Sequence, residues 1–178
     1  MTDTVFHHVT GRGVVRRPLF HDDRDYARFL KYLATAVDQF DWRCHSYCLI
    51  PNHYHLLLET PVGSLPRGML VIAGSYARAF NHRYKTDGHV FQGPYAAEPI
   101  VKDSHLLEVI RYIANNPVEA GLCKRPEDWP PSSYRATAAL DHAPPWLCVD
   151  FVRRTCGTYG GYAHFCNRVA TELQPGCS

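Results

Sequence analysis

Residues 42–59, WRCHSYCLIPNHYHLLLE, contain two apolar runs that are separated by a Pro-Asn pair. Runs of this length and composition are typical of strands, and a Pro-Asn pair is typical of a tight turn. The stretch therefore predicts a β-hairpin, with one strand over residues 42–50 and the next beginning at His53. Because side chains alternate along a strand, His53 and His55 are expected on one face and the residues between them on the other.

The rest of the chain adds strands and helices around this hairpin. Hydrophobic spacing and capping residues predict a strand over residues 4–10, a helix capped by Asp22 or Asp23, a helix over 64–84, a strand over 96–101, and a helix capped by Asp103 or Ser104 that Pro117 stops after about Asn116. The order β-α-β-β-α-β, with one added helix, is typical of an α+β fold built on a ferredoxin-like antiparallel sheet with helices on one face.

Domain organisation and cell compartment follow from length and composition. The 178 residues, 46% of them hydrophobic, are enough for one well-cored domain and an appendage. The Pro-rich piece RPEDWPPSS predicts a boundary between a domain over residues 1–123 and a small helical extension over 124–178. The start, MTDTVFHHVTGRG, lacks the apolar core of a signal peptide, no later run is long enough to span a membrane, and the seven cysteines form no CxxC pair. We therefore expect reduced thiols and a cytoplasmic protein.

The net charge of +2 is too small to indicate nucleic-acid binding by itself, so an anion site must be a local cluster. The first candidate is GRGVVRR, residues 11–17, whose arginines can pair with phosphates and whose glycines let backbone N–H groups approach. The alternative is a solvated basic turn.

The histidine pair has two interpretations. Two imidazoles on one strand face can both bind a divalent cation and leave positions open for a third ligand and a substrate. The alternative is a pair of core histidines bonded to carbonyls or to Glu59, which is the commoner case for so short a motif.

The predicted third helix changes that balance. Its apolar stripe excludes Tyr112, which at about 100° per residue lies on the opposite side of the helix. Asn116 follows one turn later on the same face, so its amide oxygen and the Tyr112 hydroxyl can converge. An exposed tyrosine and an asparagine before a proline are common, but together with the histidine pair they suggest a metal-assisted nucleophile.

Three segments, YCLIPNHYHLLLE, GHVFQGPY and RYIANNPVEAGL, resemble in order and spacing the REP-associated tyrosine transposases, which belong to the single-tyrosine HUH nucleases (His-hydrophobic-His). The stretches HHVTGRG and WPPSSYR and the acidic segment at residues 19–25 are also similar to the family's, so the resemblance covers nearly the whole chain to about residue 140.

The resemblance implies a role for each matching residue. His53 and His55 match the HUH histidines, Tyr112 matches the nucleophile, and Asn116 matches a polar third metal ligand. The cation would be Mg²⁺ or Mn²⁺, with zinc as an open alternative. A phenol is a poor nucleophile at its free pKa of about 10, so it needs deprotonation and a polarised electrophile. The implied intermediate is a covalent 5′-phosphotyrosine with a free 3′-OH.

By the same resemblance, the partner is single-stranded DNA beside a short hairpin from a repetitive extragenic palindrome. The protein is expected to associate with the nucleoid, as a monomer or a dimer. The residues expected to contact this DNA are Arg12, Arg16, Arg17, His89 and Gln92. Pro94 departs from the family, which usually has arginine after FQG, so we expect a phosphate contact to be missing there.

Two other classes of function stay open. A non-catalytic nucleic-acid-binding module on the same sheet would not need Tyr112 and Asn116. A metal hydrolase would need a carboxylate as general base, for which Glu59 and Glu108 are the candidates. In the extension, four possible zinc ligands match no standard zinc-site spacing and are better explained as buried thiols and an unrelated histidine: Cys148, Cys156, His164 and Cys166.

Overall fold

A computed structural model describes residues 3–167. The strands are β1 (Thr4–Arg12), β2 (Arg43–Ile50), β3 (His53–Pro61) and β4 (Ala96–Ile100), and the helices are α1 (Asp23–Gln39), α2 (Leu65–Tyr84), α3 (Asp103–Glu119), α4 (Tyr134–Thr137), α5 (Val149–Gly157) and α6 (Tyr162–Asn167), with 3₁₀ turns η1 (Val14–Arg16) and η2 (Pro126–Asp128). The predicted α+β class is confirmed.

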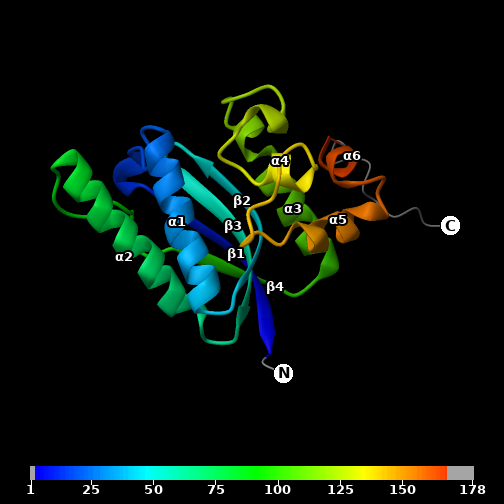
Figure 1. Ribbon diagram of the computed structural model, residues 1–178, viewed down its shortest axis with the longest axis horizontal. Coiled ribbons are helices and arrows are strands. Elements are labelled where there is room, and N and C mark those ends of the chain that lie inside the picture. Colours follow the sequence, from blue (N-terminus) through cyan, green and yellow to red (C-terminus); the bar gives the residue numbers. More distant parts are fainter. Residues whose placement is uncertain (1–2, 168–178) are drawn as a thin grey trace.

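The four strands form one antiparallel sheet in the order β2-β3-β1-β4, which is the ferredoxin-like arrangement (Figure 1). The hairpin predicted from residues 42–59 is present as β2 and β3. β1 runs two residues further than the predicted strand, because Gly11 and Arg12 continue to pair with Tyr54 and His53.

Helices cover both faces of this sheet. On one face α1 and α2 pack over Tyr54, Leu56 and Leu58 of β3, and on the other face α3, α5 and α6 enclose the core that contains Leu57 (Figure 1). Successive residues of β3 thus enter different cores, as the alternation predicts. The ferredoxin-like pair of helices lies on one face as expected, and the added helix α3 covers the other.

The extension after residue 123 packs directly against the sheet and α3. Ser132 bridges to Cys48 of β2, and Leu147 bridges to Cys44. In α3 the Asn115 amide donates to the Cys166 carbonyl of α6 at 2.9 Å. These segments share both hydrophobic cores with residues 3–123. The division into two parts at residue 123 remains a prediction.

The expected ends of the third helix are wrong at both termini. α3 continues through Pro117 to Glu119, and its N-cap is Lys102, which makes no side-chain capping bond. A proline this close to the C-terminus removes only its own hydrogen bond to the preceding turn, and Pro117 is buried, so packing compensates. Asn116 consequently lies within a continuous helix, where its backbone carbonyl accepts from the Ala120 N–H at 2.9 Å.

Within residues 3–167, each helix is too short or too polar to cross a membrane.

Candidate active site

The histidine pair lies at the end of β3 that follows the hairpin turn. His53 faces Arg12 of β1 in the register and His55 faces Thr10. The His53 and His55 rings meet edge to face with centroids 5.0 Å apart. His55 is only 6% exposed and His53 is half-buried. Both imidazoles therefore share one face of a central strand, the face covered by α3.

Among residues 3–167, each of the two rings has one nitrogen in a hydrogen bond and the other without a partner. His53 Nδ1 lies 2.8 Å from the side-chain oxygen of Asn52, and His55 Nδ1 lies 3.0 Å from His8 Nε2. Among the described residues, His55 Nε2 is buried without a hydrogen-bond partner. An N–H at Nδ1 of each ring leaves Nε2 with a bare lone pair, which is the form that binds a metal.

Burial keeps both imidazoles uncharged. Desolvation lowers the pKa of His53, and the nearby Arg12 charge adds to the effect. Desolvation also lowers the pKa of His55 to about 3, with further contributions from His53, His8 and Arg12. A neutral imidazole is needed for metal binding, so both side chains are in the binding form at neutral pH.

The buried His55 predicts acid sensitivity of the metal-free protein. Between pH 6.5 and about 3 the unfolded chain takes up a proton that folded His55 does not accept, so the free energy of unfolding falls as the pH falls. From pH 7 to pH 5, the wild type should lose about 1–2 kcal/mol more than His55→Gln. Urea denaturation with a chelator present measures this difference, and equal losses would show that His55 is readily protonated in the folded state.

α3 brings the predicted nucleophile to the histidines. The Tyr112 ring meets His55 edge to face with centroids 5.1 Å apart, and it meets His8 in the same way at 6.0 Å. Tyr112 is 39% exposed, so a substrate can reach it. Asn116 lies one turn later and is 5% exposed, and its Oδ1 is buried with no hydrogen-bond partner among residues 3–167.

This donor set fits a divalent cation. Two unpaired buried acceptors, His55 Nε2 and Asn116 Oδ1, are costly unless a partner binds them. Within the described residues, no group of three or more His, Cys, Asp or Glu side chains is arranged to hold a metal. A site here would consist of two imidazoles and an amide oxygen, which suits Mn²⁺ at least as well as Mg²⁺.

A cleft of about 240 Å³ opens beside the histidines. Its walls include both imidazoles together with Arg12 from β1 and Gln92 from the loop before β4. Pro94 also lines it, so the departure from the family sequence lies at the cleft itself. Two predicted DNA contacts are thus beside the histidines.

The other predicted DNA contacts lie further along the same loops. Arg17 and His89 line a separate cavity, and Arg16 is exposed in the turn η1 with φ of 58°. The expectation that the Gly13 N–H approaches DNA is wrong, because it donates to the Asn52 carbonyl at 2.9 Å. Gly13 is required for close packing instead, since a Cβ there would lie 2.0 Å from the Arg17 carbonyl oxygen.

His8 is a site residue that the sequence analysis did not identify. It touches His55 and the Tyr112 ring, and across the β1–β4 pair it faces Glu98. A Glu98 carboxylate oxygen lies 3.7 Å from His105 Nε2 of α3. An acidic residue and a second histidine are therefore close to His8. The available signals were the alternation of β1, which places His8 and Thr10 on one face, and the predicted ferredoxin-like order, which places β1 next to β3, but nothing in the sequence indicates the register that brings His8 to His55.

The carboxylates expected for a metal hydrolase are used elsewhere or exposed. Glu59 lies at the far end of β3, where it bonds to His45 at 3.0 Å and to Thr4 at 2.9 Å. Glu108 is exposed on α3. In the extension, Cys156 and Cys166 are buried in the core under α3, while Cys148 lies near Arg43, so the possible zinc ligands do not gather.

Comparisons with known proteins agree with this architecture. The family model described as "Transposase IS200 like" matches residues 2–116, a span that contains His8, the histidine pair, Tyr112 and Asn116. None of the curated proteins matches the sequence.

Two solved structures are similar. A REP-associated tyrosine transposase bound to a REP hairpin has a TM-score of 0.67 and 17% identity, with coverage of 83% of this chain and 87% of that chain. At this identity the similarity concerns the fold. A structure from Deinococcus radiodurans has a TM-score of 0.48 and 17% identity, over 65% of this chain and 92% of that chain, which is too distant to support an argument.

Proposed function

This chain belongs to the family of IS200-like transposases, and we propose that it cuts and rejoins single-stranded DNA beside a hairpin through a covalent bond to Tyr112. The observation that carries the proposal is the meeting of Tyr112 with His55 at 5.1 Å between ring centroids, on the face that also bears His53. The solved structure with this fold is bound to a REP hairpin, which supports a hairpin substrate.

The metal-binding part of the proposal rests on three side chains. His53 and His55 present neutral nitrogens, and Asn116 presents an unpaired buried oxygen. Mg²⁺ or Mn²⁺ bound there would polarise the scissile phosphate and make its phosphorus a better electrophile.

Tyr112 supplies the attacking atom. Its Oη forms a bond to phosphorus while the bond from phosphorus to the 3′ oxygen breaks, the phenol loses its proton, and the departing 3′ oxygen gains one. The 5′-phosphotyrosine conserves the energy of the phosphodiester bond. Attack by a 3′-OH can therefore rejoin a strand without ATP.

The cleft residues bind the strand. Arg12 can neutralise a phosphate beside the histidines, and Gln92, whose backbone N–H bonds to the Arg12 carbonyl, can donate to phosphate or base from the same part of the cleft. Arg16 and Arg17 extend the positive charge along the neighbouring turn, where both are exposed. Arg12 and Pro94 both line this cleft. Pro94 cannot pair with a phosphate, so the charge for a phosphate contact here comes from Arg12.

The test of the function is a covalent adduct. The protein is incubated with Mn²⁺ and a labelled oligonucleotide that carries a hairpin with single-stranded flanks, and the products are separated on a denaturing gel. We expect a protein band that carries the label and a shortened DNA with a free 3′-OH. Cleavage without an adduct would indicate a hydrolase, and binding without cleavage would indicate a non-catalytic module.

His8 is expected to hold His55 in its metal-binding form. With the proton of His55 on Nδ1, this nitrogen donates to His8 Nε2, which fixes the ring orientation and leaves His55 Nε2 bare. His8→Leu removes the acceptor and should weaken Mn²⁺ binding about 10- to 100-fold. His8→Gln keeps an acceptor near the same place and should recover most of the affinity. Calorimetric titration with Mn²⁺ measures both.

The neighbouring His7 offers a matched control. It lies on the same strand with similar exposure, but its ring faces the other way, 3.4 Å from the Thr60 hydroxyl. His7→Leu should therefore leave Mn²⁺ affinity unchanged. If His7→Leu and His8→Leu bind Mn²⁺ equally well, His8 has no positioning role.

A further inference from the structure

A second cavity, of about 290 Å³, lies between the turn that follows β1 and the C-terminal part of α2. One wall consists of three aromatic rings, those of His21, Phe80 and Tyr84. Their centroids are 4.7 Å apart for His21 and Tyr84, 4.7 Å for Phe80 and Tyr84, and 5.6 Å for His21 and Phe80. The volume is near the lower limit for small-molecule sites, about 300 Å³, so it suits one planar ring system.

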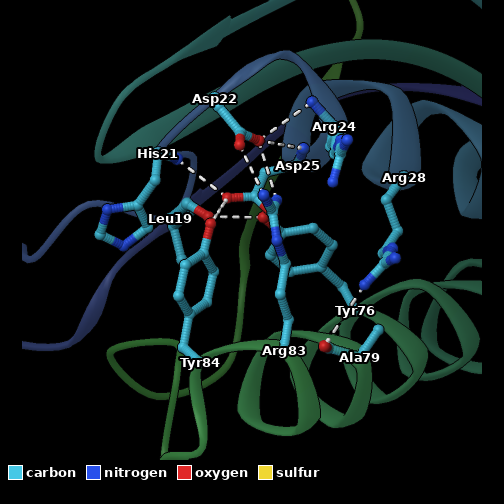
Figure 2. A network of polar contacts seen from close by, with 10 residues as sticks. All are labelled: Leu19, His21, Asp22, Arg24, Asp25, Arg28, Tyr76, Ala79, Arg83 and Tyr84. Carbon is cyan, nitrogen blue, oxygen red and sulfur yellow. Dashed lines mark hydrogen bonds and ion pairs between the residues drawn. The ribbon is translucent and has the colours of Figure 1, made fainter.

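Two residues of the aromatic wall, His21 and Tyr84, are held in place by a buried carboxylate (Figure 2). Asp25 is 1% exposed and accepts from the Tyr84 hydroxyl at 2.6 Å, from Arg83 at 2.6 Å and from the His21 backbone N–H at 3.0 Å. A buried charge with three donors is well compensated and keeps its neighbours rigid. The His21 ring itself remains exposed at the surface of this network.

The part of the cavity formed by the loop after α2 is also ordered. The Asn81 amide donates to the Gly88 carbonyl at 3.0 Å, and its oxygen accepts from the Thr86 hydroxyl at 3.0 Å, so the loop after α2 is tied to the helix. Asp87 and His89 line this side, and both are exposed. A pre-formed cavity of this kind binds a ligand without first having to become ordered.

A short backbone ladder joins the lining of the cavity to the lining of the cleft beside the histidines. The Gln92 N–H donates to the Arg12 carbonyl at 2.8 Å, and the Val14 N–H donates to the Val90 carbonyl at 2.9 Å. Arg12 and Gln92 line the cleft, whereas Val14 and Val90 line the cavity. Two residues of extended chain span about 7 Å, so a strand lying in the cleft needs little length to reach the cavity.

We propose that this cavity binds one unpaired nucleobase of the DNA strand that occupies the cleft, an inference that rests on the proposed function. The base stacks on the aromatic wall, and Arg17, which is exposed and lines the cavity, pairs with the adjoining phosphate. The Asp87 carboxylate repels a phosphate but accepts from an exocyclic amino group, so an edge of the stacked base and not the phosphate faces Asp87.

The test places 2-aminopurine, one position at a time, through the unpaired flanks of the hairpin oligonucleotide, with a chelator present so that no cleavage occurs. Stacking quenches its fluorescence, and we expect quenching concentrated at one position. His21→Ala removes a ring without touching the backbone bond to Asp25. It should abolish that quenching and weaken binding of the flanked hairpin about fivefold or more, while a hairpin without flanks binds as before.

Two control variants isolate the base contact. His82 is another exposed histidine, near the C-terminal end of α2, and it does not line the cavity. His82→Ala should therefore leave both the quenching and the hairpin affinity unchanged. Tyr84→Phe keeps the ring and loses the bond to Asp25, so the quenching should survive. The proposal is overturned if no position is quenched, or if His21→Ala behaves like His82→Ala.

Failure of this inference and failure of the proposed function give different results. An adduct with Tyr112 but no quenched position rejects the base site alone. A quenched position that depends on His21, without any adduct, rejects the covalent chemistry alone. No binding of the hairpin rejects both.

Discussion

Replacement of Tyr112 by phenylalanine should abolish DNA cleavage and the covalent adduct while the protein still folds and binds the hairpin. The change removes one oxygen from a 39% exposed side chain and keeps the ring that contacts His8 and His55. Stability should therefore change by no more than about 0.5 kcal/mol. Loss of the attacking atom should lower the cleavage rate on the order of 10⁴-fold or more. Denaturing gels and thermal melting measure the two effects.

Other tyrosines provide the control for this experiment. Tyr54 is buried in the core under α1 and α2, on the face of β3 away from the histidines. Tyr95, in the loop before β4, is half-buried and also packs against that core. Tyr95→Phe should therefore cleave and form the adduct at the parental rate. An adduct that persists in Tyr112→Phe would identify another nucleophile and refute the central assignment.

Replacement of His53 or His55 by alanine should remove Mn²⁺ binding and cleavage together, with hairpin affinity largely intact. Loss of phosphate polarisation costs several kcal/mol of transition-state stabilisation, which lowers the rate on the order of 10³-fold. Hairpin affinity comes mainly from phosphate contacts, which these variants keep. Calorimetry with Mn²⁺, a cleavage assay and a gel shift measure the three quantities.

The two alanine variants differ in structural risk. His55 is almost fully buried, so His55→Ala leaves a cavity, whereas His53 is half-buried and its removal should disturb the fold less. His7→Ala, which removes an imidazole whose ring lies on the other side of β1 beside Thr60, is the control and should cleave normally. Cleavage at the parental rate by either His53→Ala or His55→Ala would show that the metal role is wrong.

Much of the fold was predictable because its signals are local. The alternation in residues 53–58 separates residues of two cores, and the Pro-Asn turn sets the hairpin. The position of Tyr112 off the apolar stripe of its helix likewise follows from helical geometry alone. These features depend on spacing within one element, which the sequence displays directly.

What could not be predicted depends on contacts between distant segments. His8 and His55 are 47 positions apart, and their contact depends on the register in which β1 pairs with β3, which the predicted fold class does not fix. The continuation of α3 through Pro117 depends on burial of that proline, which local propensity does not register. The aromatic cavity requires the start of α1 and the end of α2 to meet at Asp25.

The strand β1 has a consequence for use of the protein as a coupling reagent. Its nine residues are paired with β3 along their whole length, with Thr4 opposite Pro61 at one end and Arg12 opposite His53 at the other. At about 3.4 Å per residue, its two ends are roughly 27 Å apart. A dye, bead or fused domain attached ahead of Thr4 is thus held well away from the cleft. The Tyr112 ring contacts His8, in the middle of this strand, so an oligonucleotide joined to Tyr112 would be attached roughly 14 Å from the Thr4 end.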